Sequence, residues 1–208
     1  MLISGHGSNL RALFAACAGP TYPAEIVSVV SDRAEAPGLA YAQAAGTCSA
    51  VIAHQSRQAF AAQAEALLRD QRVQLVCLAG FMRVLDAAFV EAWRDRIINI
   101  HPSLLPAFPG LHPQSQALAA GVRFTGCTVH FVRREVDTGP IISQAVVPIH
   151  PDDDEASLAA RILCVEHRLY PITVRLIAEG RVRVVADKVE IEGWRAPKIA
   201  LQNPDSCR

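Results

Sequence analysis

An amide and an imidazole stand two residues apart at the end of an apolar run near the middle of this chain. The run covers residues 97–100 and contains Asn99, and it is followed by His101 and then by Pro102. Side chains of a strand alternate between its two faces, so Asn99 and His101 are expected on the same face. Pro102 ends the strand because it cannot donate to a ladder. An amide donor beside a titratable base suits a reaction in which a carbonyl oxygen gains charge while a proton moves.

An aspartate in a later loop is the expected third member of this group. Asp137 opens the segment Asp137–Pro140, which lies between two strand-like runs further along the chain. A carboxylate near His101 would orient its ring or hold a water for proton transfer. The alternative is that Asn99 caps a turn and His101 is a structural histidine. An amide, an imidazole and a loop carboxylate in one chain favour the catalytic interpretation.

A glycine-rich turn near the start of the chain is a candidate binding site for a phosphate group. Gly5 and Gly7 allow a tight backbone turn between a strand fragment and a helix-like segment. The amides of Gly7, Ser8 and Asn9 would then point at an anion at the N-terminus of that helix. A plain turn in which Ser8 is the helix N-cap is the simpler alternative.

The same turn also fits part of a dinucleotide-binding fingerprint. Gly5 and Gly7 are followed by Asp32 at the end of the next strand-like run, where such sites hold a ribose hydroxyl. Leu10, however, stands where the fingerprint requires its third glycine. The phosphate interpretation is therefore favoured over an NAD site.

A second loop suited to ligands follows the apolar run at residues 75–79. Ligands of open α/β sheets bind outside the carboxyl ends of the strands, and loop 79–85 is expected at such an end. This loop combines apolar side chains with Arg83, which suits a flat aromatic ligand carrying a carboxylate. A hydrophobic turn packed on the core is the alternative. Arg57, at the start of a predicted helix, would form a local salt bridge or reach an acid of the ligand.

The order of strand-like and helix-like segments predicts the fold that positions these residues. Over the first two-thirds of the chain they alternate, which predicts βαβ units and an α/β fold with a mostly parallel twisted sheet and helices on both faces. Strands are expected there at residues 2–3, 25–30, 48–53, 75–79 and 97–100, and helices at 8–18, 38–45, 56–69 and 86–92.

The last third of the chain has a different pattern. Two strand-like runs flank the loop that carries Asp137, which predicts antiparallel additions to the sheet. The expected elements are strands at 125–132 and 141–149, a helix at 154–179 that Pro171 could interrupt, a hairpin at 182–191 and a tail at 198–208.

Composition limits the class of protein. The chain has 208 residues, 51% of them apolar, with 20 basic and 20 acidic residues and a mean hydropathy of +0.21. These values predict a single domain over residues 1–208 and argue against nucleic acid as a partner. The 6 scattered cysteines lack the paired spacing of a zinc site, so no metal is expected. The N-terminus does not resemble a signal peptide and no apolar run approaches membrane-spanning length, so we expect a cytoplasmic protein that binds no membrane.

Six segments, taken together, resemble a known family in their order and spacing. They are SGHGSNL at 4–10, LAGFMRVL at 78–85, INIHPSLLPAFPGLH at 98–112, GCTVHFV at 126–132, VDTGPIISQ at 136–144 and EHRLYP at 166–171. Over nearly its whole length the chain is similar to the glycinamide ribonucleotide (phosphoribosylglycinamide) formyltransferases, a family of folate-dependent formyltransferases of purine biosynthesis. The resemblance implies a formyltransferase-like, Rossmann-related fold.

The resemblance also implies a reaction and its residues. The formyl group of the co-substrate 10-formyltetrahydrofolate would pass to the amine of glycinamide ribonucleotide through a tetrahedral intermediate. Asn99 would donate to the developing oxyanion, His101 would be the general acid/base, and Asp137 would tune His101 and order a water. The implied positions are Gly7, Ser8, Asn9 and Glu166 for the ribonucleotide, and Arg57, Met82, Arg83, Val84, Leu85 and Asn99 for the folate. Residues 1–100 would form a phosphate-binding half and 101–197 a folate and catalytic half, with no metal, in a monomer or homodimer.

Two departures from the family pattern bear on binding. The strand before the glycine-rich turn has only Leu2 and Ile3 where the family has a full strand, so a truncated or mis-assigned start is one interpretation. Leu163 stands on the long helix where many members carry a polar residue, which weakens the case for phosphate contacts from that helix.

Related folate enzymes share the amide, imidazole and carboxylate, so other features must distinguish them. Formyltetrahydrofolate hydrolases resemble N-H-H-S-F-L-P at this point, methionyl-tRNA formyltransferases resemble S-L-L-P followed by R-W-R-G-A, and both carry a further domain. Residues 107–112 read AFPGLH here, which favours the ribonucleotide enzyme. A hydrolase or another folate-dependent formyltransferase is the alternative. A non-catalytic nucleotide-binding module would leave Asn99, His101 and Asp137 unexplained.

Overall fold

The centre of the structure is a seven-stranded sheet in the order β3-β2-β1-β4-β5-β6-β7. The computed structural model describes residues 1–196, 198 and 200–203. The strands are β1 (Leu2–Ile3), β2 (Ser28–Ser31), β3 (Cys48–Val51), β4 (Val76–Leu78), β5 (Ile97–His101), β6 (Phe124–Phe131) and β7 (Ile141–Pro148). The first five pair in parallel, whereas β6 and β7 are antiparallel additions. The predicted mostly parallel sheet with antiparallel additions is confirmed.

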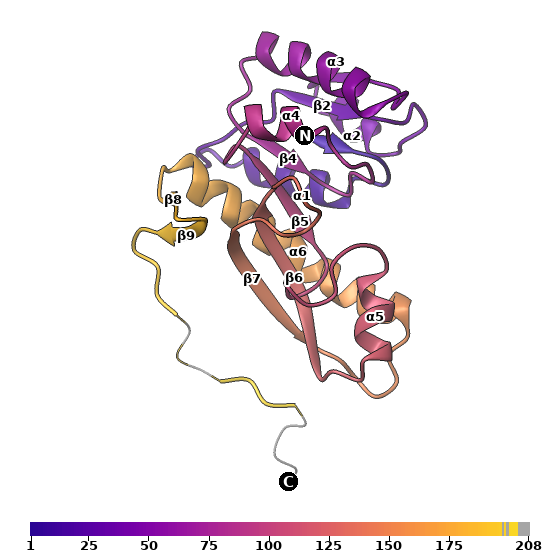
Figure 1. Cartoon of the computed structure of the whole chain (residues 1–208), viewed down its shortest axis with the longest axis vertical. Coiled ribbons are helices and arrows are strands. Elements are labelled where there is room, and N and C mark those ends of the chain that lie inside the picture. The colour runs from indigo at the N-terminus through magenta and orange to yellow at the C-terminus, as the bar shows by residue number, and fades with distance from the viewer. Residues whose placement is uncertain (197, 199, 204–208) are drawn as a thin grey trace.

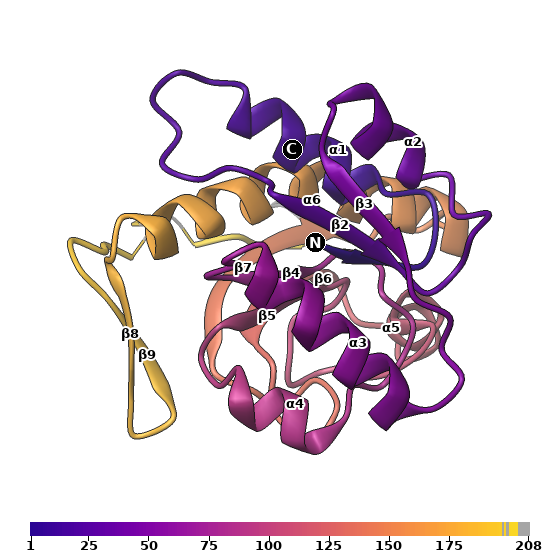
Figure 2. The same ribbon diagram turned by 90° about the horizontal axis from the view of Figure 1, so that it is seen from above.

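Helices cover both faces of this sheet (Figures 1 and 2). One face carries α1 (Ser8–Cys17), α2 (Leu39–Ala44) and the long α6 (Glu155–Ala178), and the other carries α3 (Arg57–Asp70) and α4 (Ala87–Ala92). A short helix, α5 (Pro113–Ala119), packs against α6. The helices on opposite faces are the expected consequence of right-handed crossovers in both directions from β1.

The alternation of side chains along the central strands divides the core into two parts. Ile98 and Ile100 of β5 pack under α1 and α6, whereas Ile97 packs with Phe60 of α3 and Phe89 of α4. Asn99 and His101 follow Ile97 at intervals of two, so they project toward the face that carries α3 and α4. The pleat of one strand therefore determines the side on which the amide and the imidazole are found.

Several predicted boundaries are corrected by the structure. The second strand begins at Ser28 and not at Glu25, and the fifth extends through His101. Helix α6 continues through Pro171 without interruption. Tyr170 and Thr173 on either side of this proline are fully buried, so tertiary packing outweighs the lost backbone hydrogen bond.

The last described elements form a separate two-stranded sheet. Strands β8 (Val182–Val185) and β9 (Lys188–Ile191) make the predicted hairpin, which follows α6 and contacts β7 at the edge of the main sheet (Figure 2). Part of the expected tail, residues 199 and 204–208, lies outside the described residues. None of the helices in the described part of the chain is both long and apolar enough to span a bilayer.

We expect Tyr170→Phe to lower the free energy of unfolding by about 1–2 kcal/mol. The fully buried Tyr170 hydroxyl donates to the Leu78 carbonyl at 2.8 Å, joining α6 to the end of β4. Urea unfolding followed by circular dichroism measures the change. Tyr41→Phe on α2 is the control, with an expected change below about 0.5 kcal/mol. Equal losses in the two variants would contradict this role for the Tyr170 hydroxyl.

Candidate active site

Strand β5 presents Asn99 and His101 side by side toward the neighbouring strand β6. The antiparallel register places Asn99 opposite His130 and His101 opposite Thr128. His101 is buried, and the Asn99 side chain is partly buried. The expectation that the amide and the imidazole share a face is confirmed, and the interpretation of Asn99 as a turn cap is wrong.

Asp137 reaches this pair from the loop between β6 and β7. One of its carboxylate oxygens lies 3.4 Å from His101 Nδ1 and the other lies 3.7 Å from His130 Nε2. The loop must turn sharply, and Gly139 allows this because a Cβ at that position would collide with the Phe131 carbonyl. Asp137 therefore contacts His101 directly and is joined to Asn99 through His130, whose Nε2 lies 3.3 Å from Asn99 Nδ2.

His130 of β6 is a fourth member of the group. Its Nδ1 lies 3.0 Å from the Phe131 carbonyl and its Nε2 lies 3.3 Å from Asn99 Nδ2. Burial lowers the pKa of His130, so the neutral ring donates from Nδ1 and accepts from the Asn99 amide at Nε2. This contact fixes the orientation of the Asn99 amide and leaves its second N–H available. The usable signal was the alternation in β6, which puts His130 on the face opposite Val129 and Phe131.

The segment after β5 covers these side chains. The Phe108 carbonyl lies 3.0 Å from His101 Nε2, and the Gly110 N–H donates to Asp137 at 2.8 Å. Only 6% of the His101 side chain is exposed as a result. In this arrangement the Phe108 carbonyl occupies the hydrogen-bonding position of Nε2 that a reactant would need.

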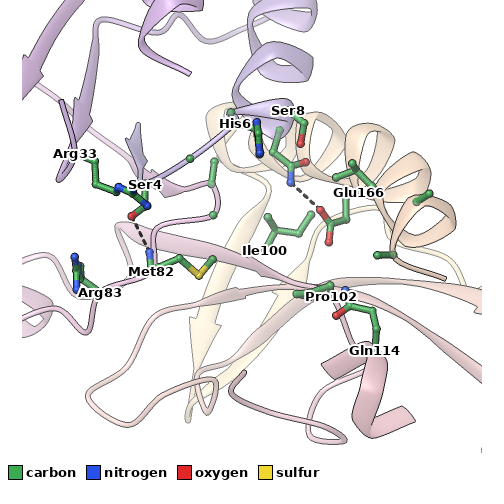
Figure 3. Close-up of a pocket in the computed structure, with 18 of the residues that line it drawn as sticks. Ser4, His6, Ser8, Arg33, Met82, Arg83, Ile100, Pro102, Gln114 and Glu166 are labelled. Carbon is green, nitrogen blue, oxygen red and sulfur yellow. Dashed lines mark hydrogen bonds between the residues drawn. The ribbon is translucent and has the colours of Figure 1, made fainter. Parts of the chain in front are cut away.

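A cavity of about 740 Å³ adjoins the group at the carboxyl ends of the parallel strands (Figure 3). Ile100 and Pro102, on either side of His101, form part of its wall. Six of the residues predicted to bind ligands also line it, namely Gly7, Ser8, Asn9, Met82, Arg83 and Glu166. The glycine-rich turn and loop 79–85 therefore face one common space, whose wall includes Ile100 and Pro102, the chain neighbours of His101.

The glycine-rich turn is held by its backbone and by a buried polar contact. Helix α1 begins at Ser8 with Gly7 as N-cap at a φ of +71° and no side chain capping it, so the prediction of Ser8 as N-cap is wrong. A Cβ on Gly7 would also lie 2.8 Å from Cα of Gly38. Asn9 Nδ2 donates to Glu166 of α6 at 2.7 Å. Burial raises the pKa of Glu166, and the hydrogen bond from Asn9 opposes this shift.

The remaining predicted positions are placed differently. In the described part of the chain, the lining of the cavity does not include Arg57, Val84 or Leu85, nor the predicted catalytic residues Asn99, His101 and Asp137. Arg57 is an exposed residue in the first turn of α3. Arg83 is paired within the protein, since its Nε donates to Asp32 at 2.7 Å. Asp32 is therefore engaged with an arginine, which counts against the dinucleotide interpretation.

Hydrogen bonds and ion pairs between side chains contribute to the electrostatics of the site. No group of three or more His, Cys, Asp or Glu side chains within the described residues is arranged to hold a metal. Besides Asn9 and Glu166, the polar side chains of the cavity lining include those of His6, Arg33 and Gln114 (Figure 3). Such a set suits a phosphorylated or hydroxylated ligand at one end.

Comparison with known proteins identifies the family. The model of the formyl transferase family matches residues 1–174. The chain belongs to this family. Phosphoribosylglycinamide formyltransferase of Escherichia coli (strain K12) is 40% identical over 200 residues, covering 95% of this chain and 94% of that protein.

Other formyl transferase relatives extend this comparison. Glycinamide ribonucleotide transformylase 1 from Symbiobacterium toebii superposes with a TM-score of 0.88 at 48% identity, covering 91% of each chain. A trifunctional purine biosynthetic protein of Drosophila pseudoobscura pseudoobscura is 51% identical over 193 residues, or 90% of this chain. The chain spans only 14% of the length of that relative. A formyltetrahydrofolate deformylase from Pseudomonas syringae has a TM-score of 0.85 at 25% identity, covering 91% of this chain and 64% of the deformylase chain.

We expect His130→Gln to reduce the acid sensitivity of the fold. Because the pKa of His130 is lowered from 6.5 in the folded protein, the unfolded chain binds a proton first as the pH falls. The stability from His130 is thus present above pH 6.5 and is lost below it, at up to about 1.4 kcal/mol per pH unit. Urea unfolding at about pH 7.5 and about pH 5.5 should show a larger loss in the wild type than in the variant. Equal losses of unfolding free energy in the wild type and the variant would show that protonation of His130 does not cause the acid sensitivity.

Proposed function

We propose that this chain transfers the formyl group of 10-formyltetrahydrofolate to the amine of glycinamide ribonucleotide, a step of purine biosynthesis. The observation that carries the proposal is the meeting of Asn99, His101 and Asp137 at the carboxyl end of β5, beside the cavity. The proposal draws further support from membership of the formyl transferase family and from the E. coli relative, which this chain matches over nearly its full length.

The two substrates would enter the cavity from opposite ends. The ribonucleotide phosphate would bind the amides of Gly7, Ser8 and Asn9 at the N-terminus of α1, with Glu166 facing its hydroxyl groups. The folate would lie along loop 79–85, where the exposed apolar side chain of Met82 borders the cavity. Arg57, Val84 and Leu85 would contact the part of the folate that extends beyond the cavity. The amine and the formyl carbon would then meet next to Asn99.

The chain's own groups would support attack of the amine on the formyl carbon. As the new C–N bond forms, the formyl oxygen gains negative charge, and the free N–H of Asn99 would donate to it. His101, oriented by Asp137, would accept a proton from the attacking amine and return one to the folate nitrogen as the old C–N bond breaks. Contact between His101 Nε2 and the reactants requires the Phe108 carbonyl to withdraw. Asp137 would order a water for this proton transfer.

Several further properties belong to the same proposal. We propose one domain over residues 1–208, with a phosphate-binding half at 1–100 and a folate and catalytic half at 101–197. We also propose a cytoplasmic enzyme, a monomer or homodimer, that uses the folate as co-substrate and needs no metal, nucleic acid or membrane.

The experiment that tests the function supplies both substrates and follows release of tetrahydrofolate. We expect release only when glycinamide ribonucleotide is present. Release at the same rate without the ribonucleotide would contradict formyl transfer to the amine and would favour the hydrolase alternative.

His101→Ala should lower kcat by about 10²- to 10⁴-fold, the range for loss of a general acid/base. KM for either substrate should change only a few-fold, because binding rests on other residues. His150→Ala, at an exposed histidine in the turn after β7, is the matched control and should leave kcat unchanged. If His101→Ala lowered only the melting temperature, His101 would be a structural histidine.

A further inference from the structure

A buried carboxylate after β2 is paired with an arginine of loop 79–85. Asp32 lies immediately after β2, and only 1% of its side chain is exposed. It accepts a hydrogen bond of 2.7 Å from Nε of Arg83, whose side chain is 47% exposed. Burial of a charge is costly unless the charge is paired, so Asp32 has a strong preference for keeping Arg83 in this position.

A second contact attaches the neighbouring residue of the same loop. The Met82 N–H donates to Oγ of Ser4 at 2.9 Å, and Ser4 is buried at the end of β1 (Figure 3). Two successive residues, Met82 and Arg83, are thus bound to the ends of β1 and β2. The two loop residues and their partners, Ser4 and Asp32, all line the cavity.

These polar contacts shape a loop that hydrophobic packing alone does not hold. Phe81 is buried, but Met82 is 66% exposed and Val84 is 41% exposed. The exposed Met82 side chain borders the cavity, whereas Val84 lies outside its lining. A loop of this kind needs fixed backbone attachments if it is to present those side chains in one arrangement.

The charge state of Asp32 is consistent with such a clamp. Although burial acts to raise the pKa of Asp32, the hydroxyl of Ser4 and the guanidinium of Arg83 outweigh it and lower the pKa below 3.8. The carboxylate is therefore ionised at neutral pH, and its bond with Arg83 is charge-assisted.

We propose that Asp32 is a positioning residue for the folate co-substrate. Through Arg83, and together with the Ser4–Met82 hydrogen bond, it fixes loop 79–85 in the conformation that accepts the folate. This inference rests on the proposed function and adds to it a residue that does not itself touch the reacting atoms. Its effect is on folate affinity, whereas the ribonucleotide is held by the glycine-rich turn and Glu166.

The test compares Asp32→Asn with Glu35→Gln in the full chain. Glu35 is the matched control, since it is an exposed acid on the same loop that binds Arg33 at 3.0 Å. For Asp32→Asn we expect KM for 10-formyltetrahydrofolate to rise by about 5- to 30-fold, as for loss of one charge-assisted hydrogen bond. KM for the ribonucleotide and kcat should stay within about 3-fold, and Glu35→Gln should resemble the wild type.

A binding measurement separates this inference from the proposed function. Titration of the protein with tetrahydrofolate alone, followed by calorimetry, should show the same rise in Kd for Asp32→Asn whether or not the wild type formylates the ribonucleotide. Arg83→Gln should weaken tetrahydrofolate binding similarly, and the double variant should be no weaker than either single variant. Because the Arg83 side chain is half exposed, that variant tests the clamp even if Asp32→Asn fails to fold.

Two outcomes would overturn the inference. If Asp32→Asn lowered only the melting temperature and left tetrahydrofolate binding unchanged, Asp32 would be purely structural. If KM rose equally for both substrates, Asp32 would shape the whole cavity and not the folate side of it.

Discussion

The antiparallel pairing of β5 with β6 is the constraint on which the site depends. It places His130 directly opposite Asn99, so the imidazole can hold the amide in one orientation. It also sends the chain beyond Phe131 back over the same face, where Asp137 meets both His101 and His130. The parallel strands position the cavity, because the glycine-rich turn and loop 79–85 both follow their carboxyl ends and both line it. The cavity and the proposed catalytic side chains therefore lie near each other, where the sheet changes from parallel to antiparallel.

Individual hydrogen bonds and ion pairs stabilise the charged groups of this protein, as expected for a chain with equal numbers of acidic and basic residues. Each buried acid has a specific partner, such as Asn9 for Glu166 and Arg83 for Asp32. The acidic residues before α6 follow the same rule. Asp154 caps the helix and Asp153 binds Arg161, whose guanidinium holds the pKa of Asp153 well below its usual range. That run therefore begins helix α6 and forms an ion pair with it.

Much of the fold followed from the sequence because period-2 and helix-length patterns are local properties. The period-2 alternation of side chains along a strand placed Asn99 and His101 on one face. Alternation in β6 indicates the face of His130, but the sequence could not place it opposite Asn99, because that depends on the register between β5 and β6. It gave no sign that the Phe108 carbonyl would cover His101, since that contact depends on the path of a loop. The sequence also left open an interruption of the long helix at Pro171. The helix is continuous there because its burial outweighs the tendency of proline to break a helix.

The most direct test follows the formyl carbon itself. The enzyme would be given 10-formyltetrahydrofolate labelled with carbon-13 in the formyl group, together with glycinamide ribonucleotide, and the label would be located by NMR. The structure predicts that the label appears as an amide on the ribonucleotide, in an amount equal to the tetrahydrofolate released. Recovery of the label as free formate, with the ribonucleotide unchanged, would contradict the account.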